Sequence, residues 1–298
     1  MKSVIIIAGP TASGKTALAI QVAKYYNTEI ISADSRQCYK ELNIGVARPS
    51  PEELKEVRHH FIATHSIHEK VTAATFEQYA LQKVNELFQR HDVVIMTGGT
   101  GLYIKAFVEG MDEIPDVPEV VRHEIITSYN QNGLEWLQEQ VQELDPIYFD
   151  RGETKNPQRL MRALEVFKAT GRSILSFQKK KIVKRDFPVV KIAIDISKED
   201  LHRNINHRVD QMVDHGLEEE VRSLIPYSHL NALQTVGYKE LFDHFNGEIS
   251  FDEAINEIKK NTRQYAKRQL TWFRKDPEWE WVNKDDALNL ITSNKLAD

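Results

Sequence analysis

Residues 9–16 read GPTASGKT and match Gly-x4-Gly-Lys-Thr, the pattern of a phosphate-binding loop, or P-loop. The glycines let backbone N–H groups converge on phosphate oxygens at the positive end of the helix that follows. Lys15 adds a point charge, and the Thr16 hydroxyl is positioned for Mg2+. The motif follows the apolar run VIIIA and opens a helix, which is the context of a true P-loop. The predicted phosphate site comprises Gly9, Pro10, Thr11, Ala12, Ser13, Gly14, Lys15 and Thr16.

The P-loop motif alone does not identify the reaction. The acidic residue that nucleotide-hydrolysing P-loop proteins have at the end of a strand is missing from its expected position. A P-loop protein that hydrolyses a nucleotide normally has an acidic residue at the end of an apolar strand, where it holds the magnesium ion. The obvious strand, DVVIM (92–96), instead ends in Thr97-Gly98-Gly99-Thr100. The residues alone therefore indicate an enzyme of phosphate chemistry, without naming its reaction.

Asp34, which follows the apolar run TEIIS, is the nearest strand-end carboxylate. The carboxyl ends of parallel strands meet at one edge of a sheet, so residues 9–16, 34–37 and 97–100 should line one crevice. Asp34 would then lie where a substrate meets the phosphates. Its alternative role is to cap a helix that starts near Ser35.

Continuous apolar strands alternate with amphipathic helices in the first hundred residues, which indicates a parallel sheet covered on both faces. Strands are expected at 4–8, 28–32, 59–66, 92–96 and, much later, 188–196. Between 112 and 185 only helices are expected, one of them capped by Asn156 and ended by Gly171. The predicted fold is therefore α/β, a P-loop NTPase-like core of residues 1–112 and 186–298 with a helical insertion domain at 113–185.

The charges are separated along the chain, although the net charge is only −5. Segment 155–185 has ten Lys or Arg and one acid, and segment 257–275 has seven and one. Separated charge suits a surface that binds a polyanion, although solvated helix faces would explain each run equally well. The single cysteine, Cys38, and the lack of a long apolar stretch lead us to expect a cytoplasmic protein without a membrane span.

Seven motifs in order, from residue 4 to about 276, resemble those of the bacterial tRNA dimethylallyltransferases. They are GPTASGKT, SADSRQCYKELNIGVARP, TGGTGLYIKA, NPQRLMRALEVFKATG, NHRVDQMVDHGL, QTVGYKEL and TRQYAKRQLTWFRKD. The chain departs from the family at Arg36, where Met is frequent, and at Cys38, where Val is frequent. With one cysteine it also cannot carry the zinc finger of eukaryotic relatives.

The resemblance implies transfer of a dimethylallyl group from dimethylallyl diphosphate to the exocyclic amine of the adenosine 3′ of the tRNA anticodon. Under it the P-loop and Mg2+ stabilise a diphosphate leaving group, which Arg208 helps to grip. Asp34 matches the general base of the family, and Thr100 matches a residue that orients the amine, although Thr100 would also suit a helix N-cap. With Lys15 these are the implied catalytic residues.

The resemblance also implies tRNA contacts, made by the residues that match RNA-binding positions of the family. They are Asp34, Ser35, Arg36, Gln37, Thr100, Arg122, Gln158, Arg159, Leu160, Met161 and Arg162. The late helix adds a predicted basic stripe at Lys259, Lys260, Arg263, Lys267 and Arg274, with Ile258, Tyr265 and Trp272 on a packing side.

Three alternatives to tRNA prenylation are a kinase, an enzyme that prenylates free AMP and a non-catalytic RNA-binding protein. A small-molecule P-loop kinase would use Asp34 as base for a hydroxyl acceptor, but it would need neither basic segment. An enzyme that prenylates free AMP should lack the RNA surface, and a non-catalytic RNA-binding protein would not need Lys15, Thr16 and Asp34 together. Whether ATP occupies the P-loop, as a nucleotide-binding motif suggests, stays open, and the family precedent is a monomer.

Overall fold

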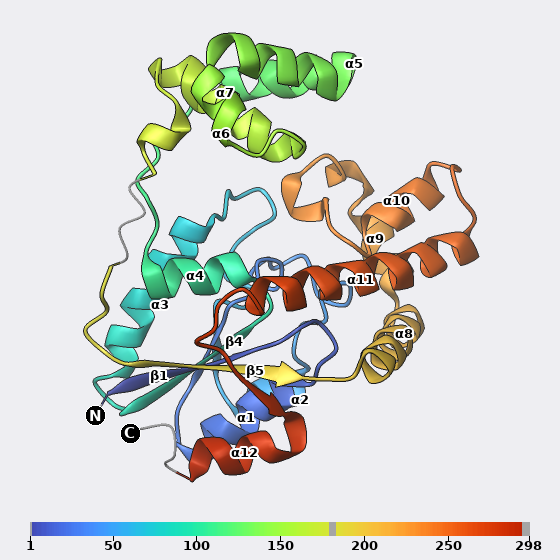
Figure 1. The fold of residues 1–298 in the computed structure, drawn as a ribbon. Helices are drawn as coiled ribbons and strands as arrows, with labels where there is room; N and C mark the ends of the chain where they lie inside the picture. Colours follow the sequence, from blue (N-terminus) through green and yellow to red (C-terminus); the bar gives the residue numbers. More distant parts are fainter. Residues whose placement is uncertain (1, 179–182, 294–298) are drawn as a thin grey trace. The chain divides into compact units, whose positions relative to one another are not determined.

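A computed structural model describes residues 2–178 and 183–293 of the chain (Figure 1). The chain forms two compact units, a core unit of Met1–Glu109 and Lys184–Asp298 and an insertion unit of Gly110–Val183. The sequence analysis placed the insertion at 113–185. Residues 179–182, which carry part of the basic segment 155–185, lie outside the described residues.

The core unit is built on one parallel sheet with the strand order β3-β2-β4-β1-β5-β6. Its strands are β1 (Ser3–Ala8), β2 (Ile30–Ser32), β3 (His59–His60), β4 (Val93–Gly98), β5 (Val189–Asp195) and β6 (Glu280–Asn283). Alternate residues of β1 pack into two different apolar clusters, Val4 and Ile6 into one and Ile5 and Ile7 into the other. Both faces of the sheet are thus buried, which explains why its strands are continuously apolar.

Helices cover both faces of the sheet (Figure 1). One face packs against α1 (Lys15–Tyr25) and α12 (Lys284–Thr292), and the other against α3 (Ala73–Leu87), α4 (Gly101–Glu109) and α11 (Phe251–Phe273). The remaining helices of the core unit are α2 (Pro51–Glu56), α8 (Lys198–Asp214), α9 (Leu217–Ser223) and α10 (Lys239–Phe245), with the short 3-10 helices η2 (Ile225–Tyr227) and η3 (Asn231–Leu233). The predicted α/β class is confirmed.

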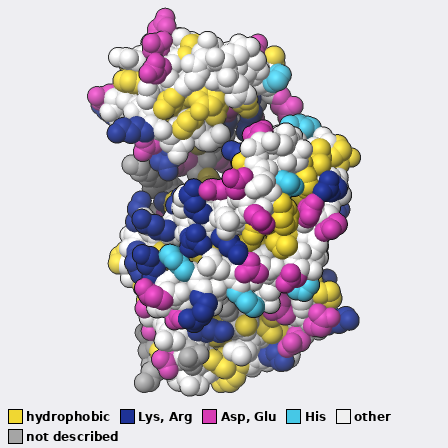
Figure 2. Space-filling model, turned by 90° about the vertical axis from the view of Figure 1, so that its right-hand side faces the viewer, with side chains coloured by type: hydrophobic (Ala, Val, Ile, Leu, Met, Phe, Trp, Pro, Cys, Tyr) yellow, Lys and Arg dark blue, Asp and Glu magenta, His cyan; other side chains and the backbone are white. Residues whose placement is uncertain are grey.

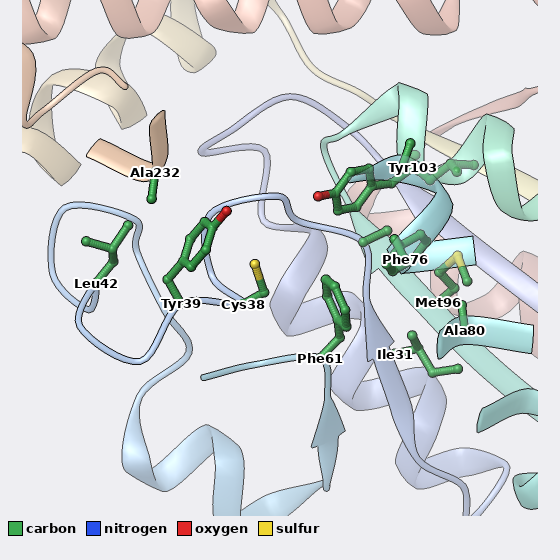
Figure 3. Close-up of a cluster of buried hydrophobic side chains, with 14 of the residues drawn as sticks. Ile31, Cys38, Tyr39, Leu42, Phe61, Phe76, Ala80, Met96, Tyr103 and Ala232 are labelled. Atoms are coloured by element: carbon green, nitrogen blue, oxygen red, sulfur yellow. The ribbon is translucent and has the colours of Figure 1, made fainter. Parts of the chain in front are cut away.

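An aromatic cluster anchors the loop that follows β2. Phe76 of α3 stacks on Tyr103 of α4 at 4.7 Å between ring centroids and meets Phe61 edge-on at 5.1 Å. Figure 3 shows this group beside Cys38 and Tyr39 of the loop, both buried. Buried aromatic pairs contribute about 0.5–1.5 kcal/mol beyond their apolar area. The loop that carries Asp34 is therefore fixed by packing.

The insertion unit consists of α5 (Glu119–Leu144), α6 (Pro146–Arg151), α7 (Pro157–Thr170) and η1 (Ile174–Ser176), with no strand among its described residues. The predicted limits of α7 are confirmed. The Asn156 side chain accepts a hydrogen bond from the Arg159 amide at 3.3 Å, and Gly171 ends the helix at φ 67°. Long α5 is broken at Gly133, where φ is 77°.

Two expectations about the strands were wrong. The strand predicted at 59–66 contains only His59–His60, because Phe61 and Ala63 take positive φ angles of 62° and 49° that no strand permits. Beyond Arg274 no element was expected, yet β6 and α12 follow and extend the sheet past β5. The segment is short and strongly charged, so its strand pattern is weak.

Candidate functional site

A pocket of about 600 Å³ opens at the carboxyl end of the sheet. Its wall includes the P-loop residues Thr11, Ala12, Gly14, Lys15 and Thr16, the loop residues Asp34, Ser35, Arg36 and Gln37, and Thr97, Gly98 and Arg208. The loops after β1, β2 and β4 therefore line one crevice, as predicted. Its volume is typical of sites for small-molecule ligands and cofactors.

Two cationic side chains, Lys15 and Arg208, lie at the predicted phosphate-binding loop. Ala12 and Gly14 take φ angles of 64° and 85°, and Gly14 directly precedes α1, whose first amides have no partner within the helix. Lys15 donates to the Pro10 carbonyl at 3.2 Å, and Arg208 of α8 donates to Thr11 Oγ1 at 3.4 Å. Gly9, Pro10, Ala12 and Ser13 are buried and form the body of the loop.

The electrostatics of the pocket favour an anion. Burial and, to a smaller extent, the nearby charge of Arg208 lower the pKa of Lys15, Asp34 opposes both effects, and the resulting pKa is about 8. Burial also lowers the pKa of Arg208. An anion held between the two side chains would offset their mutual repulsion. Figure 2 shows Lys and Arg side chains gathered in one area near the middle of the displayed face.

Asp34 lines the pocket and also caps the backbone, although it caps a turn in place of the predicted helix. Its Oδ1 accepts hydrogen bonds from the amides of Arg36 at 2.8 Å and Gln37 at 3.2 Å, and residues 35–38 form turns. Its Oδ2 makes no hydrogen bond within the described part of the chain, and the residue lines the pocket. The two amide bonds thus hold Oδ1 in place, and Oδ2 stays without a hydrogen bond on a loop that is fixed by packing.

Thr100, in the loop between β4 and α4, contacts the turn that carries Asp34. Its Oγ1 accepts from the Ser35 amide at 3.1 Å and donates to Ser35 Oγ at 3.3 Å. Its amide donates to the Ala33 carbonyl at 3.2 Å. Thr100 therefore sits beside Asp34, and its hydroxyl positions the loop that carries the carboxylate.

Two other predicted tRNA contacts brace this loop. Gln37 Nε2 donates to the carbonyls of Val46 and Ala47 at 3.2 and 2.9 Å. Arg36 Nη1 donates to the Asn231 carbonyl at 3.0 Å. Both side chains line the pocket, so they can keep these bonds and still present a polar edge to a ligand.

Helix α11 contributes pocket residues that the sequence analysis assigned elsewhere or missed. Tyr265, Arg268 and Gln269 line the pocket, although Tyr265 was expected to pack. Gln269 Oε1 accepts from the Thr11 amide at 2.8 Å, and its Nε2 donates to the Gly99 carbonyl at 2.9 Å, which joins the P-loop to the loop after β4. Burial and nearby Asp34 raise the pKa of Tyr265 to about 12, while a hydrogen bond with Thr100 lowers it.

The predicted basic stripe of α11 is partly occupied by protein contacts. Lys259 forms an ion pair with Asp210 of α8 at 2.5 Å, and Arg263 donates to Asn206 of α8 at 2.7 Å. Lys259 and Arg263 thus face α8, whereas Tyr265 faces the pocket. The other residues of the predicted stripe, Lys260, Lys267 and Arg274, are exposed. The periodicity of the sequence separated a basic side of α11 from an aromatic side, but it could not predict which side packs against the rest of the protein.

In the insertion unit, the predicted tRNA contacts differ in exposure. Arg122 and Arg162 both approach the buried carboxylate of Glu165, at 3.9 and 3.3 Å. Gln158 and Arg159 are exposed at the start of α7. Leu160 and Met161 are buried in the apolar core of the unit, and their predicted contact with tRNA stays a prediction.

The described residues contain no cluster of three or more His, Cys, Asp or Glu that could hold a metal ion. Thr16 remains the predicted ligand, and it shares the pocket with Asp34. A membrane-spanning helix is likewise absent from the described part of the chain.

The fold and the pocket define a P-loop-like α/β enzyme with a cationic site, and comparison with known proteins identifies its family. The model of the IPP transferase family matches residues 37–276. The chain belongs to the IPP transferase family.

Curated relatives match nearly the whole chain. A tRNA dimethylallyltransferase of Christiangramia forsetii is 49% identical and covers 95% of this chain and 93% of the relative. One of Flavobacterium johnsoniae is 44% identical, with 99% and 98% covered.

Solved structures agree in fold. The tRNA isopentenylpyrophosphate transferase of Bacillus halodurans is 34% identical, with a TM-score of 0.71 over 98% of this chain and 94% of that chain. A eukaryotic dimethylallyltransferase acting on tRNA, 24% identical, shares the fold with a TM-score of 0.78 over 99% of this chain and 77% of that chain.

Proposed function

We propose that this protein transfers a dimethylallyl group from dimethylallyl diphosphate to the exocyclic amine of the adenosine 3′ of the anticodon in tRNA. The observation that carries the proposal is one pocket in which Lys15 and Arg208 face Asp34, in a member of the IPP transferase family. The curated relatives that match the whole chain are named for this transfer. The product is isopentenyladenosine in tRNA.

The P-loop holds the leaving group in this proposal. As the bond between the allylic carbon and oxygen breaks, the electron pair stays on the diphosphate. Lys15, Arg208 and the amides at the start of α1 are aimed at the charge that develops there. In this proposal the P-loop holds a diphosphate and not a nucleotide, which agrees with the absence of the magnesium-holding carboxylate that nucleotide hydrolases have at the end of such a strand.

Asp34 takes the proton of the amine. The adenine amine is a weak nucleophile, because its lone pair is delocalised into the ring. As the new bond between nitrogen and carbon forms, a proton leaves that nitrogen, and Asp34 Oδ2 is the free oxygen that can accept it. Thr100 positions the turn that carries Asp34, because its Oγ1 accepts a hydrogen bond from the Ser35 amide.

The donor set in the pocket fits Mg2+. This ion prefers octahedral oxygen ligands, keeps several waters and is bound mainly through substrate phosphates and one or two protein groups. Thr16 supplies a hydroxyl at the pocket wall, and no protein cage lies among the described residues. When bound, Mg2+ would offset negative charge on the diphosphate.

The target adenosine must leave the anticodon stack to reach the pocket, at a cost of a few kcal/mol. The exposed residues Gln158 and Arg159 of the insertion unit, with the half-buried Arg122 and Arg162, are proposed to contact the anticodon stem-loop. The enzyme is proposed to act as a monomer in the cytoplasm, where the buried thiol of Cys38 stays reduced.

Replacing Arg159 with alanine should reduce the salt dependence of RNA binding. If Arg159 contacts one phosphate, the slope of log K against log salt should fall by about one. Lys168→Ala is the matched control, because Lys168 is exposed on the same helix and lies 180° around it at 100° per residue. Equal slopes for both variants would remove Arg159 from the RNA surface.

Binding of the donor should weaken above pH 8. The neutral amine of Lys15 cannot offset diphosphate charge, and its pKa of about 8 in the free protein means that protonation is lost as the pH rises through that value. The affinity for an unreactive thiolo analogue of dimethylallyl diphosphate should fall by up to about tenfold per pH unit. Calorimetry should also show proton uptake at pH 8.5, and a flat affinity between pH 7 and 9.5 would contradict this role.

The direct test uses labelled dimethylallyl diphosphate, Mg2+ and unmodified anticodon stem-loop RNA, with AMP and ATP in parallel reactions. Label on the RNA alone is the expected result. Label on AMP would instead assign the protein to the enzymes that prenylate free nucleotides. ATP turnover without transfer would favour the kinase alternative.

A further inference from the structure

The carboxylate of Glu220, on α9, holds the backbone of a loop in the pocket wall. Its Oε2 accepts hydrogen bonds from the amides of Asn43 at 3.1 Å and Ile44 at 2.8 Å, and its Oε1 accepts one from the Gly45 amide at 3.0 Å. Successive amides that converge in this way form a backbone site for one anion. We call residues 43–48 the wall loop, since three of them line the pocket.

The same carboxylate binds a second segment of the pocket wall. Tyr238 is fully buried, and its hydroxyl donates to Glu220 Oε1 at 2.6 Å. Burial and the adjacent charge of Glu220 hold the pKa of Tyr238 well above its usual value, so the phenol stays protonated and donates. Its neighbours Gly237 and Lys239 line the pocket. Glu220 thus joins the wall loop to this second segment through four hydrogen bonds.

The wall loop in turn contacts the turn that carries Asp34. Gln37 Nε2 donates to the carbonyls of Val46 and Ala47 at 3.2 and 2.9 Å, and the Gln37 amide donates to Asp34 Oδ1 at 3.2 Å. A series of hydrogen bonds and backbone therefore runs from Glu220 to the proposed base. The placement of such a group matters, because a misplacement of about 1 Å can slow a reaction by about 10²-fold.

We propose that Glu220 is a positioning residue of the transfer reaction, which acts through the wall loop and Gln37 on the placement of Asp34. Glu220 does not itself line the pocket, so it acts on the reaction only through other residues. The inference rests on the proposed function, since Asp34 is the base of that reaction. The P-loop and Arg208 lie outside this series of hydrogen bonds, so binding of the donor should not depend on Glu220.

Glu220→Gln tests the proposal with little change of side-chain volume. The glutamine NH2 group can only donate, so two of the four donors lose their acceptor, whichever way the amide points. We expect kcat for transfer to fall by about 10- to 100-fold, with affinity for the unreactive thiolo donor analogue unchanged within about twofold. Glu220→Asp, which keeps the carboxylate, should recover part of the loss. Glu219→Gln, an exposed neighbour on α9, is the matched control and should behave like the wild-type protein.

A double variant distinguishes positioning of Asp34 from a general loss of stability. Adding Glu220→Gln to Asp34→Asn should slow that variant by less than about threefold, because the base that Glu220 positions is already absent. A combined loss equal to the product of the two single losses would overturn the proposal, as would a wild-type rate for Glu220→Gln.

Hydrogen exchange of the amides of Gln37 and residues 43–45 measures the contact without any transfer. Glu220→Gln should speed exchange at these amides, whereas exchange at the wild-type rate would show that Glu220 does not hold the wall loop. If the wild-type protein shows protection that depends on Glu220 but transfers no dimethylallyl group, the link from Glu220 to Asp34 stands and the proposed function fails.

Discussion

Asp34→Asn is expected to lower kcat for dimethylallyl transfer by about 10²–10⁴-fold, with RNA affinity unchanged within about twofold. Asparagine keeps a side-chain oxygen that can accept from the amides of Arg36 and Gln37, so the turn is preserved. It cannot take the amine proton at neutral pH. Single-turnover assays with saturating stem-loop RNA measure this step directly.

Comparison of Asp34→Asn with Asp34→Ala separates the two roles of the carboxylate, capping and proton transfer. Alanine removes the cap and the base together, so it should lower kcat at least as much and also loosen the loop, with a cost near 1 kcal/mol in stability. If the asparagine variant turned over at nearly the wild-type rate while alanine was inactive, Asp34 would be a capping residue only, and the base would have to be sought elsewhere.

Lys15→Met should lower kcat/KM by about 10²–10³-fold, a typical loss for one preorganised group that stabilises transition-state charge. Methionine keeps much of the buried aliphatic volume and removes the charge at the P-loop. The matched control is Lys24→Met on the same helix, where the lysine is exposed and forms an ion pair with Glu56. Steady-state transfer to stem-loop RNA at pH 7 measures both variants.

Arg208 variants also test whether positive charge in the pocket stabilises the diphosphate leaving group. Its position next to Lys15 predicts that the double variant Lys15→Met, Arg208→Met loses less than the product of the single losses, because both groups act on one diphosphate. Full activity of Lys15→Met would show that the P-loop lysine does not stabilise the leaving group.

Local sequence signals were sufficient for the sheet and for the loops at its carboxyl edge. Strands β1 and β4 are continuous apolar runs, and the P-loop motif places α1, so the crevice between these loops follows from the geometry of parallel sheets. The caps of α7 at Asn156 and Gly171 are equally local. These features depend on residues that lie close together in the sequence.

Contacts between distant segments could not be read in the same way. Gln269 joins the P-loop to the loop after β4 from 258 residues beyond Thr11 and 170 residues beyond Gly99, and no local sequence motif marks it. Lys284 of α12 approaches Gly14 so closely that a Cβ there would lie 3.0 Å from its Nζ. Tyr265 was assigned to packing because spacing shows only that it shares a side with Ile258 and Trp272.

In the proposed reaction the pocket holds a diphosphate that leaves intact. The most direct measurement is the stoichiometry of phosphate products during transfer to anticodon stem-loop RNA, without any nucleotide triphosphate. We predict one inorganic diphosphate released for each modified adenosine, and no orthophosphate. Release of orthophosphate in step with product, or a requirement for ATP, would contradict this account of the P-loop.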